Sequence, residues 1–159
     1  MKLIPLTQGQ FAKVDDADFG LISSFKWCAR REKDTFYAVR ATSRNSPGGK
    51  STMRMHRVIS GAVHSDIVDH IDHDGLNNQR SNLRFCTHTQ NMRNRRGAIS
   101  NSASGMRGVS KPRGRSKWLA CIRVNKKTLY LGTYNSSPEA SAAYAAANKK
   151  YFGEFSGAI

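Results

Sequence analysis

Short apolar runs separated by turn-forming residues dominate the pattern of hydrophobic and polar positions along the first third of the chain. Residues 10–14 and 36–41 alternate apolar with polar side chains, which is typical of half-buried strands. The stretches at 8–9 and 46–49 are rich in turn-forming residues and separate such runs. We therefore predict that residues 1–55 form antiparallel strands, and that their sheet packs beside the region that follows.

A second pair of strands is predicted in the middle of the chain, on either side of a polar loop. Residues 67–68 form the apolar run before the loop, and residues 83–85 carry the apolar positions after it. The loop is rich in Gly and Asn, so the two strands should fold back on each other. Thr87 with Gln90 three residues on is a capping-box pattern, and it predicts a helix that begins at Thr87 and carries Asn91 near its first turn.

The last third of the chain contains three further strand patterns. We predict strands at 108–110, 118–124 and 128–132, with turns at 112–114 and 125–127.

A helical pattern follows these strands. Ser136 and Ser137, then Pro138 and Glu139, combine capping-box and early-proline signals, so a helix should begin there. The apolar stripe that we expect to pack against the sheet consists of Ala140, Ala143, Tyr144, Ala147 and Tyr151. Both tyrosines on this stripe are expected to be core residues.

Charge narrows the choice of partner. The 159 residues contain 26 Lys and Arg against 11 Asp and Glu, a net charge of +15. Residues 1–91 carry 13 basic and 9 acidic side chains (net +4), and residues 92–159 carry 13 basic and 2 acidic side chains (net +11). Such a balance favours a polyanion. A basic surface can also serve solubility or attract a membrane surface. No apolar run approaches the ~20 residues of a membrane span.

The three cysteines are widely separated and odd in number. They show no C-x-x-C pair, so no structural zinc is expected. The first residues lack the long apolar core of a signal peptide. A reducing cytoplasm is therefore the expected compartment.

The polar loop carries the strongest chemical signal. A carboxylate and an amide oxygen, from Asp69 and Asn91, suit one hard divalent cation such as Mg²⁺ or Mn²⁺, with room left for water and a phosphate. Neutral His70 could take the proton from an attacking water, since its ordinary pKa of about 6.5 suits a base near neutral pH. Neighbours on a strand point to opposite faces, so a bulge or twist is needed to aim both Asp69 and His70 inward.

These residues resemble the HNH nucleases of the ββα-metal fold. The order Asp69-His70, Asn82, Asn91 matches that family, and the stretch at 56–59 resembles the lead-in of its homing-type branch. The resemblance implies that His70 is the general base, that Asn82 braces the loop, and that Asp69 and Asn91 hold the metal. A phage or bacterial setting is also expected from this resemblance. The last position is Asn, as in intron-encoded nicking members, which implies that one strand is nicked.

Several residues near the motif have open roles. His73 stands where the family more often has Gly, and we assign it no role. For His56 and His88, a structural or solvated position is at least as plausible as contact with phosphate. Asn77 and Asn78 are most simply turn formers, because Asn tolerates left-handed backbone angles.

Residues 105–159 resemble the AP2 DNA-binding domain, which occurs in plant transcription factors and in phage and bacterial HNH endonucleases. The matching segments are 107–109, 117–120, 131–134, 139–140 and 152–153. In that family a three-stranded sheet reads the major groove. The implied DNA-binding residues are Arg107, Lys111, Arg113, Arg115, Lys117, Arg123 and Tyr130. The first-turn Trp of the plant domains is missing, so their target sequence does not transfer, and Trp118 should pack between sheet and helix.

The sequence thus predicts an α+β protein in three parts. Residues 1–91 hold the N-terminal sheet and the ββα-metal nuclease core, and residues 105–159 hold a small three-stranded sheet with one packed helix. The basic linker at 92–104 should lie along DNA through Arg93, Arg95 and Arg96.

The predicted function is site-preferring cleavage of double-stranded DNA by a monomer without an obligate protein partner. The rival class is a non-catalytic DNA-binding protein that retains the nuclease scaffold. An RNA-directed nuclease is less favoured, because stacking platforms typical of single-strand readers are not evident.

Overall fold

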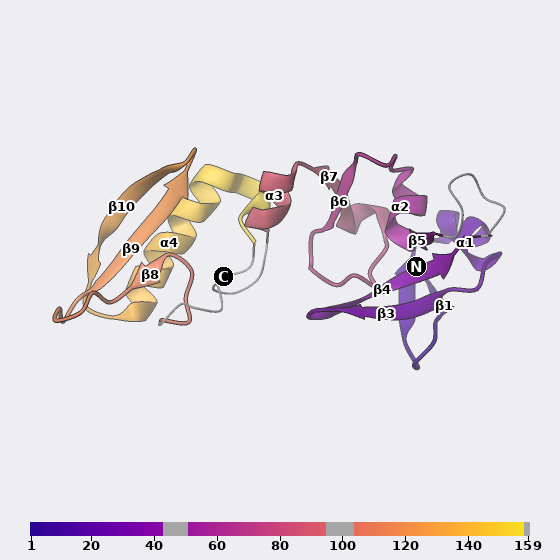
Figure 1. The fold of residues 1–159 in the computed structure, drawn as a ribbon, viewed down its shortest axis with the longest axis horizontal. Coiled ribbons are helices and arrows are strands. Elements are labelled where there is room, and N and C mark those ends of the chain that lie inside the picture. The colour runs from indigo at the N-terminus through magenta and orange to yellow at the C-terminus, as the bar shows by residue number, and fades with distance from the viewer. Residues whose placement is uncertain (43–50, 95–103, 158–159) are drawn as a thin grey trace. The chain divides into compact units, whose positions relative to one another are not determined.

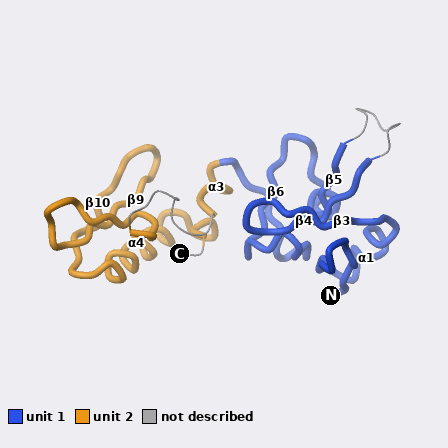
Figure 2. The backbone as a smooth tube through the Cα atoms, turned by 60° about the horizontal axis from the view of Figure 1, so that its bottom comes forward, with its two compact units in different colours: residues 1–88 blue, residues 89–159 orange. Residues whose placement is uncertain are grey.

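The computed structural model describes residues 1–42, 51–94 and 104–157, and it divides into two compact units, residues 1–88 and 89–159 (Figures 1 and 2). Small antiparallel sheets and short helices make up both units, which confirms the predicted α+β class. The predicted turn at 46–49 lies outside the described residues. Within the described ranges, no helix is long and apolar enough to cross a membrane.

The first unit begins with a hairpin of β1 (Lys2–Pro5) and β2 (Phe11–Val14), paired antiparallel from Lys2↔Val14 to Pro5↔Phe11. The predicted turn at Gln8 and Gly9 is present, and both residues have left-handed φ angles, of 60° and 65°. Helix α1 (Asp16–Ser23) follows at once.

A three-stranded antiparallel sheet forms the middle of the first unit. Its order is β3 (Cys28–Glu32), β4 (Thr35–Ala41) and β5 (Thr52–Arg54), and helix α2 (Met55–Ser60) starts where β5 ends. The alternating pattern predicted the central strand β4. It did not predict α1 or α2, because helices of 8 and 6 residues are too short to show a helical period clearly.

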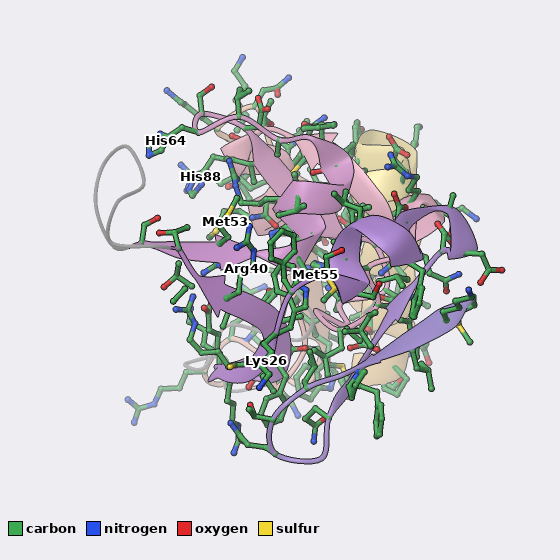
Figure 3. The ribbon with its side chains drawn as sticks, turned by 90° about the vertical axis from the view of Figure 1, so that its right-hand side faces the viewer. Lys26, Arg40, Met53, Met55, His64 and His88 are labelled. Atoms are coloured by element: carbon green, nitrogen blue, oxygen red, sulfur yellow. The ribbon has the colours of Figure 1, made fainter. Side chains whose placement is uncertain are left out.

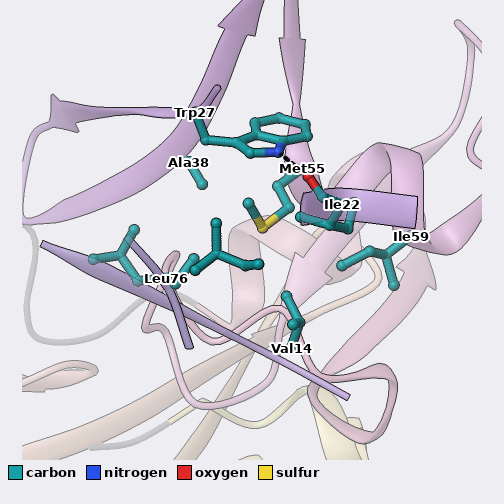
Figure 4. Close-up of a cluster of buried hydrophobic side chains, with 9 residues drawn as sticks. Val14, Ile22, Trp27, Ala38, Met55, Ile59 and Leu76 are labelled. Carbon is teal, nitrogen blue, oxygen red and sulfur yellow. Dashed lines mark hydrogen bonds between the residues drawn. The ribbon is translucent and has the colours of Figure 1, made fainter. Parts of the chain in front are cut away.

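The core of the first unit joins the β1–β2 hairpin and the β3–β4–β5 sheet to helices α1 and α2 (Figure 4). Trp27 closes one side, and its indole N–H donates to the carbonyl of Ile22 at 2.9 Å. The buried apolar side chains of this core are Ile4, Ala12, Val14, Ile22, Trp27, Ala38, Met55, Ile59 and Leu76. The N-terminal strands therefore share one core with Leu76 of the polar loop.

The two strands predicted around the polar loop are present. β6 (Ile67–His70) and β7 (Leu83–Cys86) pair antiparallel in continuous register, from Ile67↔Cys86 to His70↔Leu83. A short 3₁₀ turn, η1 (Arg80–Asn82), leads into β7. Helix α3 (His88–Arg93) begins one residue later than the start at Thr87 that the capping-box pattern predicted.

The second unit holds the predicted three-stranded sheet, in the order β10, β9, β8. Its strands are β8 (Val109–Ser110), β9 (Trp118–Val124) and β10 (Lys127–Tyr134). Helix α4 (Ser137–Phe152) packs on one face, and a 3₁₀ turn, η2 (Gly153–Phe155), follows it. Ser136 caps α4 by accepting a hydrogen bond from the N–H of Glu139, as the sequence predicted.

The helix and the sheet of the second unit approach closely. Ala140 of α4 packs with Val109 and Ala120 of the sheet, and Tyr144 is buried. Gly108 has a left-handed φ of 66°, and a Cβ there would stand 2.1 Å from the ring of Tyr144, so only glycine fits. Tyr151 is 44% exposed, and its prediction as a core residue was wrong because it lies past the end of the buried stripe.

Candidate active site

The loop between β6 and β7, residues 71–82, is closed by the side chain of Asn82. The Asn82 Oδ1 accepts from the N–H of Asp72 at 3.0 Å, and its Nδ2 donates to Asp72 Oδ1 and to the carbonyl of Asn77, both at 2.8 Å. Only 7% of Asn82 is exposed. The amide thus bridges both ends of the loop, which is the contact pattern expected of a loop brace.

Asp72 is the hub of this loop. Its carboxylate also accepts from Asn77 Nδ2 at 2.7 Å and from the N–H of Asp74 at 2.9 Å. Burial alone would raise the pKa of Asp72, but the hydrogen bonds from Asn77, Asp74 and Asn82 outweigh it and hold the pKa below its ordinary value. The loop is therefore built around an ionised carboxylate.

The left-handed backbone position of the loop is His73, with a φ of 66°. Asn77 and Asn78 do not have positive φ angles, so our explanation of them as left-handed turn formers was wrong. Their side chains act instead, since Asn78 Nδ2 donates to the carbonyl of Leu76 at 3.0 Å and Asn77 binds Asp72. Such a φ lies in the region that glycine adopts most easily.

The N-terminal strands hold the loop by its backbone. Lys13 of β2 donates its N–H to the carbonyl of Leu76 and accepts from the N–H of Asn78, both at 2.8 Å. Thr35 Oγ1 of β4 accepts from the N–H of Gly75 at 3.1 Å. A Cβ at Gly75 would stand 2.5 Å from the carbonyl oxygen of Phe36, so the loop lies directly against β4.

Two carboxylates near the start of α1 hold the far end of the loop. Asp15 accepts from Gln79 Nε2 at 3.0 Å and from the N–H of Arg80 at 2.8 Å, and these two donors lower the pKa of Asp15. Asp18 binds the guanidinium of Arg80 through two bonds, at 2.8 and 2.7 Å. The sequence did not reveal these contacts, because the partners are more than 60 residues apart.

His70 closes strand β6 and is only 5% exposed. Its ring meets the ring of His56 edge to face at 4.9 Å between centroids, and that of Tyr37 at 5.7 Å. Burial lowers the pKa of His70, against the raising effects of the Asn78 side chain and of nearby carboxylates. The imidazole is therefore neutral near pH 7, which is the form a general base requires.

His56 settles one of the open alternatives. It lies on α2, is 4% exposed, and burial together with neighbouring His70 lowers its pKa to about 3. A buried imidazole that is uncharged near neutral pH favours the structural alternative over a cationic contact with phosphate. His88, by contrast, is exposed, as is His64 (Figure 3).

Asp69 lies directly opposite Arg84 in the β6–β7 ladder. Its Oδ2 accepts from Nη2 of Arg84 at 2.9 Å and from Nε at 3.1 Å, and both side chains are about nine-tenths buried. The register runs through Asp69 and His70 without a bulge, so the bulge that we considered is not the device used. No sequence pattern singled out Arg84.

The donor chemistry fits a hard cation in part. Among the described residues, no group of three or more His, Cys, Asp or Glu side chains is placed to hold a metal ion. The predicted set is smaller, with the carboxylate of Asp69 and the amide of Asn91, and Mg²⁺ commonly keeps several waters. Asn91 lies on α3, in the second unit, and its role as a ligand stays a prediction.

The open face of the second unit's sheet carries two of the predicted DNA-binding residues. Ala120 and Ile122 of β9 point to the core, so the alternate residue Arg123 points away. Tyr130 of β10 pairs with Cys121 on that same outer face and is 62% exposed. Its hydroxyl lies 3.4 Å from Oγ1 of Thr133.

Exposed basic residues also follow the loop between β8 and β9. Arg113, Arg115 and Lys117 are exposed there. Lys111 is exposed too, and its ammonium lies 5.5 Å from the ring of Trp118. Trp118 is half-buried and packs against the core of the unit, as predicted.

Arg93 and Arg107 are less available than the sequence suggested. Arg93 stacks on the ring of Phe152 at 4.0 Å, and its carbonyl accepts from Nη1 of Arg107 at 3.1 Å. Both arginines are half-buried, so residues 92–94 of the predicted linker belong to packed structure. Arg95 and Arg96 lie outside the described residues.

Comparison with known proteins bears on the same stretch. The family described as HNH endonuclease matches residues 55–93. An uncharacterized HNH endonuclease of Acanthamoeba polyphaga mimivirus is 32% identical over 154 residues, which cover 93% of this chain and 74% of the viral protein. The chain belongs to the HNH endonuclease family. The part matched to the HNH endonuclease family runs from α2 to α3 and includes Asp69, His70, Asn82 and Asn91.

Proposed function

We propose that the protein is a divalent-metal-dependent DNA endonuclease of the homing type, which prefers certain sites and nicks one strand of the duplex. The observation that carries this proposal is the neutral, buried His70 beside Asp69. His70 directly precedes the loop that Asn82 closes. Membership of the HNH endonuclease family supports nuclease chemistry.

In the proposed reaction, His70 takes a proton from a water molecule. The water oxygen forms a bond to phosphorus, the bond from phosphorus to the leaving oxygen breaks, and the proton stays on the imidazole. Asp69 and Asn91 would hold Mg²⁺ or Mn²⁺, which when bound stabilises charge on the leaving oxygen. Arg84 fixes the carboxylate of Asp69 in one orientation.

We assign DNA binding mainly to an AP2-like second unit. Arg123 and Tyr130 on the open sheet face would meet base edges, since bidentate Arg to guanine is the commonest specific contact. Arg113, Arg115 and Lys117 would grip phosphates and add affinity without reading sequence. The half-buried Arg107 would contribute less, because its guanidinium already donates to the chain.

A second candidate function is DNA binding without cleavage. The observation that favours it is the ion pair between Arg84 and Asp69, because the proposed metal ligand already has a cationic partner. In that case the first unit would serve as a scaffold only.

One experiment decides between the two. Purified protein is incubated with plasmid and genomic DNA libraries, with Mg²⁺, with Mn²⁺ or with EDTA, and new strand ends are mapped. The nuclease proposal predicts ends that depend on the metal and cluster at preferred sites. DNA binding without any metal-dependent strand ends would support the non-catalytic scaffold.

We further expect a monomer that works in the reducing cytoplasm of a bacterial or phage-infected cell.

A further inference from the structure

Three aromatic rings from three different elements meet at the proposed general base. Tyr37 comes from β4, His56 from α2, and His70 from the last position of β6. The centroid distances are 4.9 Å for His56 to His70, 5.7 Å for Tyr37 to His70 and 5.8 Å for Tyr37 to His56. All three pairs are edge to face, with interplanar angles of 87°, 62° and 63°. We call these residues the ring cluster.

The ring cluster is held from outside as well. The guanidinium of Arg54 lies 5.2 Å from the ring of Tyr37, and two hydrogen bonds to Glu32, at 3.0 and 2.9 Å, fix that guanidinium. On another side, a Cβ at Gly75 would stand 2.7 Å from Cε1 of Tyr37. The ring of Tyr37 is thus held between Gly75 of the loop and Arg54 at the end of β5.

A base at the end of a strand needs such support. The ladder between β6 and β7 ends at His70, so it fixes the backbone of that residue but not the rotation of its ring. Edge-to-face contacts with two neighbouring rings restrict that rotation, and they do so without adding charge. His56 is uncharged, because burial and its histidine neighbour lower its pKa to about 3.

We propose that His56 and Tyr37 are positioning residues for His70, and that residues 1–60 thereby complete the hydrolytic centre. The inference rests on the function proposed above. It concerns how the base is oriented, and it gives neither residue direct contact with DNA or the reacting atoms.

The test uses the full chain and two ring-removing variants, His56→Ala and Tyr37→Ala. Single-turnover cleavage at saturating DNA should fall by between about 10-fold and about 10²-fold, as expected for a misplaced catalytic group. The dissociation constant for DNA should change by less than about twofold, since neither residue is assigned to binding. His56→Phe and Tyr37→Phe keep a ring and should recover most of the lost rate.

Loss of stability has to be separated from loss of orientation. Ile59→Val is the matched control, because Ile59 lies on the same helix as His56, is 2% exposed and packs in the apolar core without being one of the three rings. This variant should melt at a lower temperature and cleave at the wild-type rate. A folded His56→Ala protein that cleaves like wild type would overturn the proposal, as would equal rate losses in His56→Ala and His56→Phe.

A spectroscopic measurement keeps the test independent of cleavage. Long-range ¹H–¹⁵N spectra of histidine-labelled protein report the tautomer of each imidazole, and the His70 signals are identified by their absence from His70→Ala. Removal of the neighbouring rings should shift or broaden the His70 signals in Tyr37→Ala and, if it folds, in His56→Ala. If wild type does not cleave DNA, the proposed function fails while this readout still applies. Unchanged His70 signals in a folded ring-removing variant would overturn the proposal.

Discussion

The two units of the molecule differ in how far their polar side chains are buried. In the first unit the buried polar side chains include Asp18, His56, Asp69, His70, Asn78 and Asn82. Asp18 binds Arg80, Asn82 binds Asp72, and His56 packs against His70. In the described part of the second unit, Asn94 and Asn148 are buried, whereas its basic residues are largely exposed.

This contrast indicates which unit is suited to hydrolysis and which to DNA binding. A hydrolytic centre needs groups that are held in one geometry, and burial with hydrogen bonds supplies that. Contact with phosphates and base edges needs charged and aromatic side chains that reach solvent. We therefore expect the first unit to cleave DNA and the second unit to provide most of the DNA binding.

The largest expected effect is on cutting. His70→Ala should lower the single-turnover rate by at least ~10²-fold with DNA affinity nearly intact, because a general base is lost and no binding group is removed. His64→Ala is the control, since His64 is an exposed histidine of the same unit. Native-rate cleavage by His70→Ala would show that His70 is not the base.

DNA affinity should fall when basic residues of the second unit are removed. Replacing Arg113, Arg115 and Lys117 with Ala should weaken binding, and each lost phosphate contact should make the slope of log K against log salt shallower by about 0.9. Cleavage at saturating DNA should stay near the wild-type rate. Titrations at several salt concentrations measure both quantities.

Charge removal elsewhere on that unit gives the control. Lys149 and Lys150 are exposed on α4, which covers the other face of the sheet. Their double replacement with Ala should leave the salt slope closer to wild type. Equal effects of the two variants would mean that net charge, and not the β8–β9 loop, provides the grip.

The loop brace should matter for stability. Asn82→Ala removes the hydrogen bonds to Asp72 and Asn77 and leaves buried partners unsatisfied, so the free energy of unfolding should fall by about 1–3 kcal/mol. Urea unfolding measures this. Neighbouring Ser81 is exposed, and Ser81→Ala should change stability by less than about 0.5 kcal/mol. A similar value for Asn82→Ala would remove the bracing role.

The smallest expected effect is a dependence on acid. The folded pKa of Asp15 lies below its unfolded value of about 3.9, so the stabilisation is complete above that pH and is lost as pH falls through the folded pKa. The stability difference between wild type and Asp15→Asn should therefore be largest near neutral pH and shrink below about pH 4. Thermal melts across this range measure it, with the exposed Asp34→Asn as control.

Local patterns predicted the elements whose signals are contained in their own residues. Alternation identified β2 and β4, and short runs bounded by turns identified β6, β7 and the three strands of the second unit. The capping patterns at Ser136 and Thr87 located two helices. Short helices such as α1 and α2 carry too few residues for such a signal.

Tertiary contacts of the site were beyond the reach of local patterns. The motif identified Asp69, His70 and Asn82, but Arg84 and Tyr37 carry no sequence signal, and they reach the site only through strand pairing and packing. Asp15 likewise reaches the loop through tertiary structure, since it follows β2, whose Lys13 forms an isolated bridge with Asn77. His56 lies in the stretch at 56–59 that the family resemblance singled out. Its packing against His70, which the sequence did not reveal, is the basis for its proposed positioning role.

The most direct test of a single hydrolytic centre is a time course on supercoiled plasmid with Mg²⁺, alongside a sample with EDTA. The chain contains one HNH motif, so one strand should be cut per encounter. We predict that open-circle DNA appears first, that linear DNA follows later, and that EDTA abolishes both. Linear DNA that appears at once at low enzyme, or cleavage that continues in EDTA, would contradict a metal-dependent monomer that nicks one strand.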